Sequence, residues 1–302
     1  MNKEQIRQYL RRFSRWQQAE PHFVNRHADS EQQCHCCGTR FEGNICPLCG
    51  QRAGVGRVGW QSVKDSIALL WGMDSRSLFY TLLQLLARPG YLVRDYISGH
   101  LQVSFPPVKM LVVVSVFTLI IETVFHLKKE DILPIHFGIP EIDHIVQWFN
   151  NNKSWGLLFV SSFSILPTWV VFRFAPAYPR HTLPEGFFLQ VFLSVQGLLV
   201  GLLGYLFGDV GSALSVILTL VTYHQLFGYS WWGTLWRCAV VFITTFLMLS
   251  PFIFLSAMFG KPEMTAGKDI HKGLLIGGGV LAGMYLLTSL VLFIIYRLSS
   301  KR

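Results

Sequence analysis

The residues in this sequence with the clearest chemistry are its cysteines. Five of the six fall within the run 34–49, which reads CHCCGTRFEGNICPLC. Two C-x-x-C pairs can be chosen so that a glycine, Gly38 or Gly50, follows each pair. In such a knuckle the chain turns back so that both thiolates meet one ion, and the glycine permits the backbone conformation that this turn requires. Two knuckles supply a closed tetrahedral site for a structural Zn²⁺, so the predicted ligands are Cys34, Cys37, Cys46 and Cys49.

The other residues near this run leave some alternatives open. His35 and Cys36 are competing ligands, although the glycine register argues against them, and iron in a rubredoxin-like centre is an alternative to zinc. Four thiolates leave no open coordination position, which argues against a catalytic metal. Because metal-binding thiolates persist in reducing compartments, this segment is expected in the cytoplasm. Cys238, alone in an apolar run, is expected to be a buried filler.

The rest of the chain has the composition of a membrane protein. Hydrophobic residues make up 51% and charged residues 14%, against about 25% charged in soluble domains. Apolar stretches near the roughly 20 residues that a membrane span needs recur along the chain. We therefore predict an all-α membrane protein with about six transmembrane helices. Their approximate bounds are 108–127, 155–175, 186–207, 210–227, 235–259 and 274–296.

The segments before the first span divide into three predicted parts. Residues 1–33 combine a basic amphipathic helix over 3–17 with a linker, and residues 34–59 form the zinc ribbon and a glycine-rich hinge. Residues 60–106 form short helices at the membrane surface, each too short to span, and 107–302 form the transmembrane bundle. In the first helix, apolar residues recur at helical spacing beside four arginines. This pattern fits a helix in the lipid headgroup region and equally a surface helix packed on the rest of the protein.

Charge and flanking residues give an orientation and a set of partners. The net charge is +9, and basic residues that flank membrane spans explain it without nucleic acid. With the N-terminus inside, inner loops carry slightly more Lys and Arg than outer loops. The expected location is the inner membrane of a bacterium, with the N-terminus and ribbon in the cytoplasm. The expected partners are the lipid bilayer and a protein that contacts the ribbon.

Several motifs resemble an uncharacterised bacterial family of polytopic membrane proteins headed by a zinc ribbon. The cysteine run ends in C-P-x-C-G-Q, and the resemblance continues through Arg88-Pro89-Gly90, the segment 96–99 and the Phe105-Pro106-Pro107 step into the first span. It covers residues 34–110 and implies this architecture and a bacterial inner membrane. It implies no activity. Where such proteins often carry a basic pair after Gly99, this chain has His100-Leu101.

A few polar and small residues lie within the predicted spans. Glu122 is either an ion or proton site or a residue near the outer membrane interface. Gln190, Gln196, His224 and Gln225 are expected to form hydrogen bonds between helices. Glycines spaced for close helix approach serve either packing within the chain or the seam of a homodimer. They are Gly197, Gly201, Gly204, Gly208, Gly273, Gly277, Gly279 and Gly283.

Two functional hypotheses remain. The sequence contains no G-x-S-x-G, H-E-x-x-H or phosphate-loop motif, so we expect a protein that is not an enzyme. The first hypothesis is an adaptor or regulator that recruits a partner at the cytoplasmic membrane face. The alternative is a small-solute transporter, which would require Glu122, Gln196 and His224 to line one cavity. The acids and histidines between the first two spans, including His136 and Asp143, are expected to lie in a solvated loop.

Overall fold

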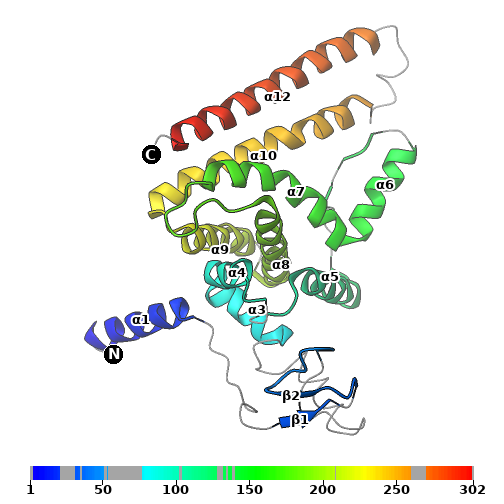
Figure 1. Cartoon of the computed structure of the whole chain (residues 1–302). Helices are drawn as coiled ribbons and strands as arrows, with labels where there is room; N and C mark the ends of the chain where they lie inside the picture. The colour runs from blue at the N-terminus through cyan, green and yellow to red at the C-terminus, as the bar shows by residue number, and fades with distance from the viewer. Residues whose placement is uncertain are drawn as a thin grey trace. The chain divides into compact units, whose positions relative to one another are not determined.

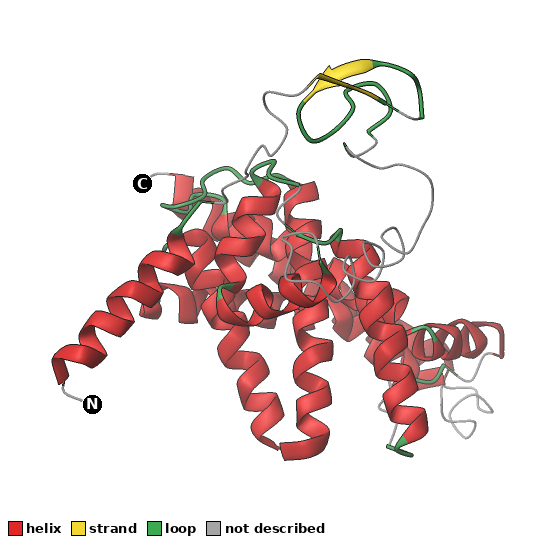
Figure 2. Cartoon of the chain, turned by 90° about the horizontal axis from the view of Figure 1, so that it is seen from below, coloured by secondary structure: helices red, strands yellow, loops and turns green. Residues whose placement is uncertain are grey.

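The structure is a computed structural model that consists mostly of helices, with one pair of short strands (Figure 2). The chain divides into two compact units. The first comprises Met1–Leu83 and Gly99–Phe105, and the second comprises Gln84–Ser98 and Pro106–Arg302. The residues that the structure describes are 3–20, 31–34, 36–50, 53, 77–101, 104–127, 132–133, 135–137, 140–207, 209–259 and 270–300.

The first unit contains a helix and a small hairpin. Helix α1 runs over Lys3–Gln18, and the antiparallel strands are β1, Glu31–Gln33, and β2, Arg40–Glu42 (Figure 1). The register pairs Gln32 with Phe41. The first knuckle lies between the two strands. The strand β1 is short because the chain turns into this knuckle directly after Gln33. The hinge predicted before residue 60 and the surface helix predicted over 60–76 lie outside the described residues.

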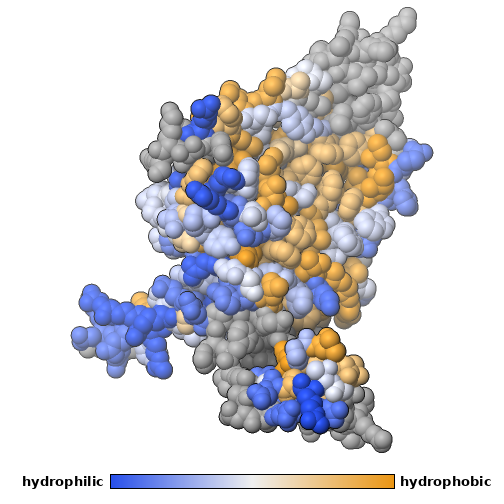
Figure 3. Space-filling view, viewed as in Figure 1, coloured by the Kyte–Doolittle hydropathy of each residue, from blue (hydrophilic) through white to orange (hydrophobic). Residues whose placement is uncertain are grey.

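The second unit is a helical bundle with the predicted spans in it. Within the described residues, four helices are long and apolar enough to cross a membrane: they cover Pro107–Val124, Lys153–Phe172, Leu183–Gly204 and Trp231–Phe254. This finding indicates a membrane protein, and much of the bundle surface seen in Figure 3 is hydrophobic. Helices also occupy the other two predicted stretches, whose described apolar parts are shorter, so six spans remain a prediction. The helices are α5 Pro107–Val124, α6 Pro140–Asn151, α7 Lys153–Phe172, α8 Leu183–Phe207, α9 Asp209–Phe227, α10 Trp231–Phe259 and α12 Ile270–Ser300.

Helix α8 lies at the centre of this unit and contacts α4, α5, α7 and α9. Helix α10 packs on α7 and α9, and α12 runs beside α10 (Figure 1). Leu189, Phe192 and Val195 of α8 are buried, whereas many apolar residues of α10 and α12 are exposed. That difference fits a bundle whose outer helices face lipid, because hydrocarbon chains are as apolar as leucine.

Helix boundaries before the first span follow local signals in the sequence. Helix α3, Leu78–Ala87, starts after Ser77, whose Oγ accepts a hydrogen bond of 3.2 Å from the backbone N–H of Tyr80. Helix α4 covers Pro89–Ile97, and a proline that lacks an N–H and has a fixed φ suits the first turn of a helix. Gly99 ends this segment with φ of 100°, a conformation that disfavours other residues. Pro89 and Gly99 therefore bound α4 through local backbone preferences.

Helix α4 packs closely against α9 at Gly90. A Cβ atom added to Gly90 would lie 2.4 Å from the backbone oxygen of Thr222 and 2.7 Å from the backbone nitrogen of Leu226. The Gly90 N–H also donates a hydrogen bond of 3.1 Å to Gln225 Oε1. Both neighbours are backbone atoms that cannot move independently, so this contact requires glycine.

We expect Gly90→Ala to destabilise the second unit by about 1–3 kcal/mol, because overpacking forces the two backbones apart. Gly197→Ala in α8 is the matched control, because an added Cβ there meets nothing within 4 Å. Thermal unfolding of both variants in one detergent measures the difference. Equal melting temperatures for the two variants would contradict the close contact between α4 and α9.

Candidate metal centre

The β1–β2 hairpin positions the first knuckle of the cysteine module. Cys34 follows β1 directly, and its N–H donates a hydrogen bond of 2.9 Å to the carbonyl of Thr39. Phe41 on β2 is buried with Cys34 and Cys46 in one small cluster. The backbone carbonyl of Gly43 accepts a hydrogen bond of 2.9 Å from Gln32 Nε2. This apolar core is very small, so the module depends on other interactions for its stability.

The two knuckles have the same backbone geometry. The Gly38 N–H donates to the carbonyl of Cys34, and the Gly50 N–H donates to the carbonyl of Cys46, both at 2.9 Å. Gly38 has φ of 75° and Gly50 has φ of 74°. L-residues with a side chain rarely adopt this conformation. The predicted role of the two glycines is therefore confirmed.

The four predicted cysteines come together. The Sγ atoms of Cys34, Cys37, Cys46 and Cys49 all lie within 4.8 Å of one another. Cys34 Sγ is 3.4 Å from Cys49 Sγ, and Cys37 Sγ is 3.5 Å from Cys46 Sγ. These distances exceed a disulfide bond of about 2.05 Å and lie near the ~3.8 Å that separates sulfurs around a tetrahedral Zn²⁺ with bonds of ~2.3 Å. The cluster could therefore hold one metal ion.

Local hydrogen bonds favour the thiolate forms that bind metals. Hydrogen bonding by the Thr39 side chain, whose Oγ1 lies 3.3 Å from Cys37 Sγ, and by the Thr39 backbone lowers the pKa of Cys37 to about 6. The backbone N–H of Cys37 in turn lowers the pKa of Cys34. Hydrogen bonds to the charged form of an acid lower its pKa. Thr39 was not singled out from the sequence, although its place after the C-x-x-C-G turn is a usable signal.

The remaining cysteines stand apart from this cluster. Cys36 is exposed and does not belong to the group of four, and Cys238 is partly buried in α10. His35, the other competing ligand, lies outside the described residues. A donor set of four sulfurs fits zinc and iron alike, so the arrangement leaves the identity of the metal open.

The structure also gives Glu122 a partner that its sequence position does not reveal. Glu122 lies near the end of α5 with 1% of its side chain exposed, and its Oε1 forms an ion pair with Nζ of Lys153 at the start of α7. The lysine side chain is 11% exposed. The pair therefore joins the ends of two helices that are far apart in the sequence.

The three glutamines that were expected to link helices form hydrogen bonds between helices. Gln190 Nε2 of α8 lies 3.4 Å from Thr168 Oγ1 of α7 and 3.3 Å from the hydroxyl of Tyr223 of α9. Gln196 of α8 donates to the carbonyl of Leu85 at 3.3 Å. Gln225 accepts from Gly90, as described above. The prediction that these glutamines link helices is confirmed.

His224 makes a ring contact with an aromatic residue. Its ring stacks on Trp231 with a centroid distance of 4.0 Å.

The glycines within the predicted spans differ in what surrounds them. Gly204 and Gly211 bring α8 and α9 together, because a Cβ on Gly211 would lie 2.5 Å from the Cα of Gly204. Nothing lies within 4 Å of a Cβ added to Gly197, Gly201, Gly279 or Gly283. Close packing of α8 on α9 therefore explains why position 204 is a glycine. For the four glycines that have free space around them, a homodimer seam stays a prediction.

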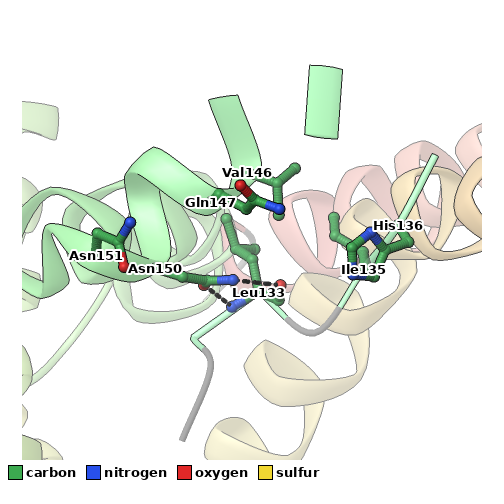
Figure 4. A pocket seen from close by; sticks show the side chains of 7 residues that line it. All are labelled: Leu133, Ile135, His136, Val146, Gln147, Asn150 and Asn151. Atoms are coloured by element: carbon green, nitrogen blue, oxygen red, sulfur yellow. Dashed lines mark hydrogen bonds between the residues drawn. The ribbon is translucent and has the colours of Figure 1, made fainter. Parts of the chain in front are cut away.

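The segment between α5 and α7 was expected to be a solvated loop, but its described part folds around α6. Leu133, Phe137 and Val146 form a buried cluster. Asn150 fixes Leu133 by two hydrogen bonds, from the Leu133 N–H to Oδ1 at 2.9 Å and from Nδ2 to the Leu133 carbonyl at 3.1 Å. Beside it lies a hollow of about 330 Å³ (Figure 4). His136 Nδ1 lies 3.7 Å from Asp143 Oδ1, and among the described residues these two do not belong to a group that could hold a metal ion.

His181, between α7 and α8, is a buried residue that no pattern in the sequence singled out. It is 3% exposed, and among the described residues neither ring nitrogen has a hydrogen-bond partner. Its ring packs on Phe227 at a centroid distance of 5.2 Å. Burial, together with the charge of Arg173, lowers the pKa of His181 from 6.5 to about 4.

This pKa predicts an acid-sensitive stability of the second unit. In the unfolded chain His181 binds a proton below pH 6.5, whereas in the folded chain it binds a proton only near pH 4. Stability is therefore complete above pH 6.5 and falls by roughly 2–3 kcal/mol toward pH 4. We expect His181→Phe to remove this slope and His100→Gln, at an exposed position, to keep it. Unfolding in one detergent at pH 4.5 and 7.5 measures the effect, and an unchanged slope in His181→Phe would contradict it.

Comparison with protein families gives one match. Residues 75–119 match the model of a protein family of unknown function, DUF3667. This segment contains α3, α4 and most of α5, and it includes the Arg88-Pro89-Gly90 and Phe105-Pro106-Pro107 motifs of the resemblance, but the cysteine run lies outside it. Neither the curated proteins nor the solved structures contain a match to this chain. The chain is therefore similar, over 45 of its 302 residues, to a family without a known activity.

Proposed function

We propose that this chain is a multi-pass protein of a bacterial inner membrane whose cysteine module is a zinc ribbon. In this proposal the ribbon recruits a protein partner at the cytoplasmic face, and the chain catalyses no reaction. Four thiolates around one Zn²⁺ close its coordination shell, which suits a structural role. The zinc would supply the folding energy that the small apolar cluster around Phe41 lacks.

The exposed aliphatic tip of the second knuckle carries the proposal of a protein partner. Leu48, between Cys46 and Cys49, is 72% exposed, and Ile45 is 40% exposed. Two apolar side chains held on a metal-clamped turn form a rigid anchor for a partner pocket. The described residues of the module carry one cation, Arg40, against the acids Glu31 and Glu42. Nucleic-acid binding requires a clearly basic surface, so this charge favours a protein.

Cations at one end of the second unit support the proposed orientation. The loop after α7 and the end of α9 meet there, because the Ala177 N–H donates to the carbonyl of Phe227 at 3.1 Å. At this end the guanidinium of Arg173 lies 4.4 Å from the centroid of the Trp169 ring, and that of Arg237 lies 3.7 Å from the Tyr229 ring. Aromatic residues occur at both membrane interfaces, but Lys and Arg are enriched in cytoplasmic loops, so these two arginines favour the cytoplasmic side for this end.

The alternative, a small-solute transporter, has less support. It would use Glu122, Gln196 and His224 together, and each of these has a different partner in the helix packing described above. The hollow in Figure 4 is lined by residues of the α6 region, including His136 and Asn150, and by none of these three. Polar residues that contact neighbouring helices favour a helical bundle that anchors the chain in the membrane over one that forms a transport pathway.

Site-specific photo-crosslinking in cells tests the proposed function. A photoreactive amino acid at position 48 is expected to give one discrete adduct with a protein, and the same probe at the exposed control position Glu42 is expected to give none. Leu48→Ser should lose the partner in co-purification while its metal content stays at the wild-type value. Adducts with nucleic acid, or equal adducts from both positions, would contradict recruitment through the tip.

A further inference from the structure

Helix α1 has an apolar face that no described residue of its own unit covers. None of its residues is buried. The five residues of this face, Ile6, Tyr9, Leu10, Phe13 and Trp16, are between 39% and 66% exposed. The rings of Phe13 and Trp16 stack on each other with a centroid distance of 5.7 Å. The described residues of the first unit therefore supply no cover for this face.

The charges of α1 indicate what covers this face. At 100° per residue, Lys3 and Arg12 border the apolar stripe, and Arg7, Arg11 and Arg15 lie on the opposite side. Glu4 is the only acid in the helix. The face of α1 seen in Figure 3 is accordingly hydrophilic. A surface that is anionic and has an apolar layer beneath it would match both faces of the helix at once.

A lipid bilayer is the surface that meets both requirements, and the second unit contains helices suited to span one. Helix α1 has 16 residues, or about 24 Å at 1.5 Å per residue, which is too short to cross the hydrocarbon core. Lying in the plane of the interface, it can bury its aromatic residues while its arginines reach lipid phosphates. A nucleic acid would satisfy the arginines and leave the apolar stripe in water.

We propose that α1 binds the anionic surface of the membrane in which its own chain is embedded, with Phe13 and Trp16 inserted below the headgroups. The spans hold α1 near this surface, so modest affinity suffices because the binding is intramolecular. Each arginine near an anionic leaflet adds to this affinity. An isolated helix of this length is marginal in water, and lipid therefore also determines whether α1 is stably helical.

Hydrogen exchange of the full-length protein in lipid nanodiscs tests this proposal. Amides of residues 3–18 are expected to exchange at least about tenfold more slowly in phosphatidylcholine nanodiscs that contain phosphatidylglycerol than in phosphatidylcholine alone, a ratio that corresponds to about 1.4 kcal/mol. Added salt should reduce the difference, because it screens charges at the surface. Both kinds of nanodisc contain the same scaffold protein and no other partner, so a difference in exchange between the two lipids cannot come from a protein partner.

Three variants separate lipid binding from other causes. Phe13→Gln with Trp16→Gln should remove the protection in both lipids, and Gln8→Ala on the polar face should keep it. A third variant replaces all four arginines with glutamine and should lose only the preference for anionic lipid. Its substitutions are Arg7→Gln, Arg11→Gln, Arg12→Gln and Arg15→Gln. Equal protection in neutral lipid, anionic lipid and detergent, or no protection in any of them, would overturn the proposal.

Discussion

Replacing Cys46 with serine is expected to remove the bound metal from the purified full-length protein and to unfold the cysteine module. Cys46 is the most buried of the four cysteines, and its carbonyl accepts the hydrogen bond from Gly50 that closes the second knuckle. Structural zinc contributes on the order of 10–16 kcal/mol to small modules at neutral pH. The few apolar contacts around Phe41 cannot replace that amount, so the loss should be complete and not graded.

Elemental analysis and limited proteolysis measure this loss. Wild type is expected to carry one zinc per chain after dialysis, and Cys46→Ser close to none, with new cleavage between residues 31 and 53. Cys36→Ser is the matched control, because Cys36 is exposed and outside the cluster, and it should keep the metal. Equal zinc in wild type and Cys46→Ser would refute the site. Loss of zinc in both variants would show that the ligand set is wrong, and iron in place of zinc would correct the metal.

Removing the positive charge of Lys153 is expected to have the largest effect within the helical bundle. Lys153→Met takes away the cation that faces the buried Oε1 of Glu122. Breaking a buried ion pair from one side costs about 3–5 kcal/mol, because a charge stays in a poorly solvated place. We therefore expect a greatly lowered unfolding temperature, or loss of folded protein on purification.

The positions of the two charges support this interpretation. Glu122 lies near the C-terminal end of α5 and Lys153 at the N-terminal end of α7. The helix dipole disfavours an acid at the former and a base at the latter. Neither residue is placed to stabilise its own helix, so the gain comes from the contact between them.

A double-mutant cycle isolates the energy of this pair. Glu122→Met combined with Lys153→Met should recover most of the stability lost in either single variant, since an apolar replacement of a buried pair is often neutral. Lys109→Met at an exposed position of α5 is the control and should change little. Unfolding in one detergent provides the four free energies. If the losses of the two single variants simply add, the pair is not coupled.

The sequence alone determined the features that rest on local chemistry. The spacing of the cysteines and the glycines after them predicted which sulfurs meet, because a C-x-x-C-G turn is closed by bonds within five residues. Hydropathy located helices in all six predicted stretches, and the residue types of Pro89 and Gly99 account for the breaks around α4. In each case the physical cause acts between residues that are close neighbours along the chain.

The tertiary structure decided everything that depends on which helix faces which. Glu122 meets Lys153, and Gln196 meets the carbonyl of Leu85, across 31 and 111 positions of sequence. Gly90 is enclosed by backbone atoms, whereas Gly197 faces open space, although both are glycines in helices. Hydropathy gives the length of an apolar helix and not the direction of its polar side chains. Contacts between distant helices are set by packing of whole faces, and no short run of residues encodes that arrangement.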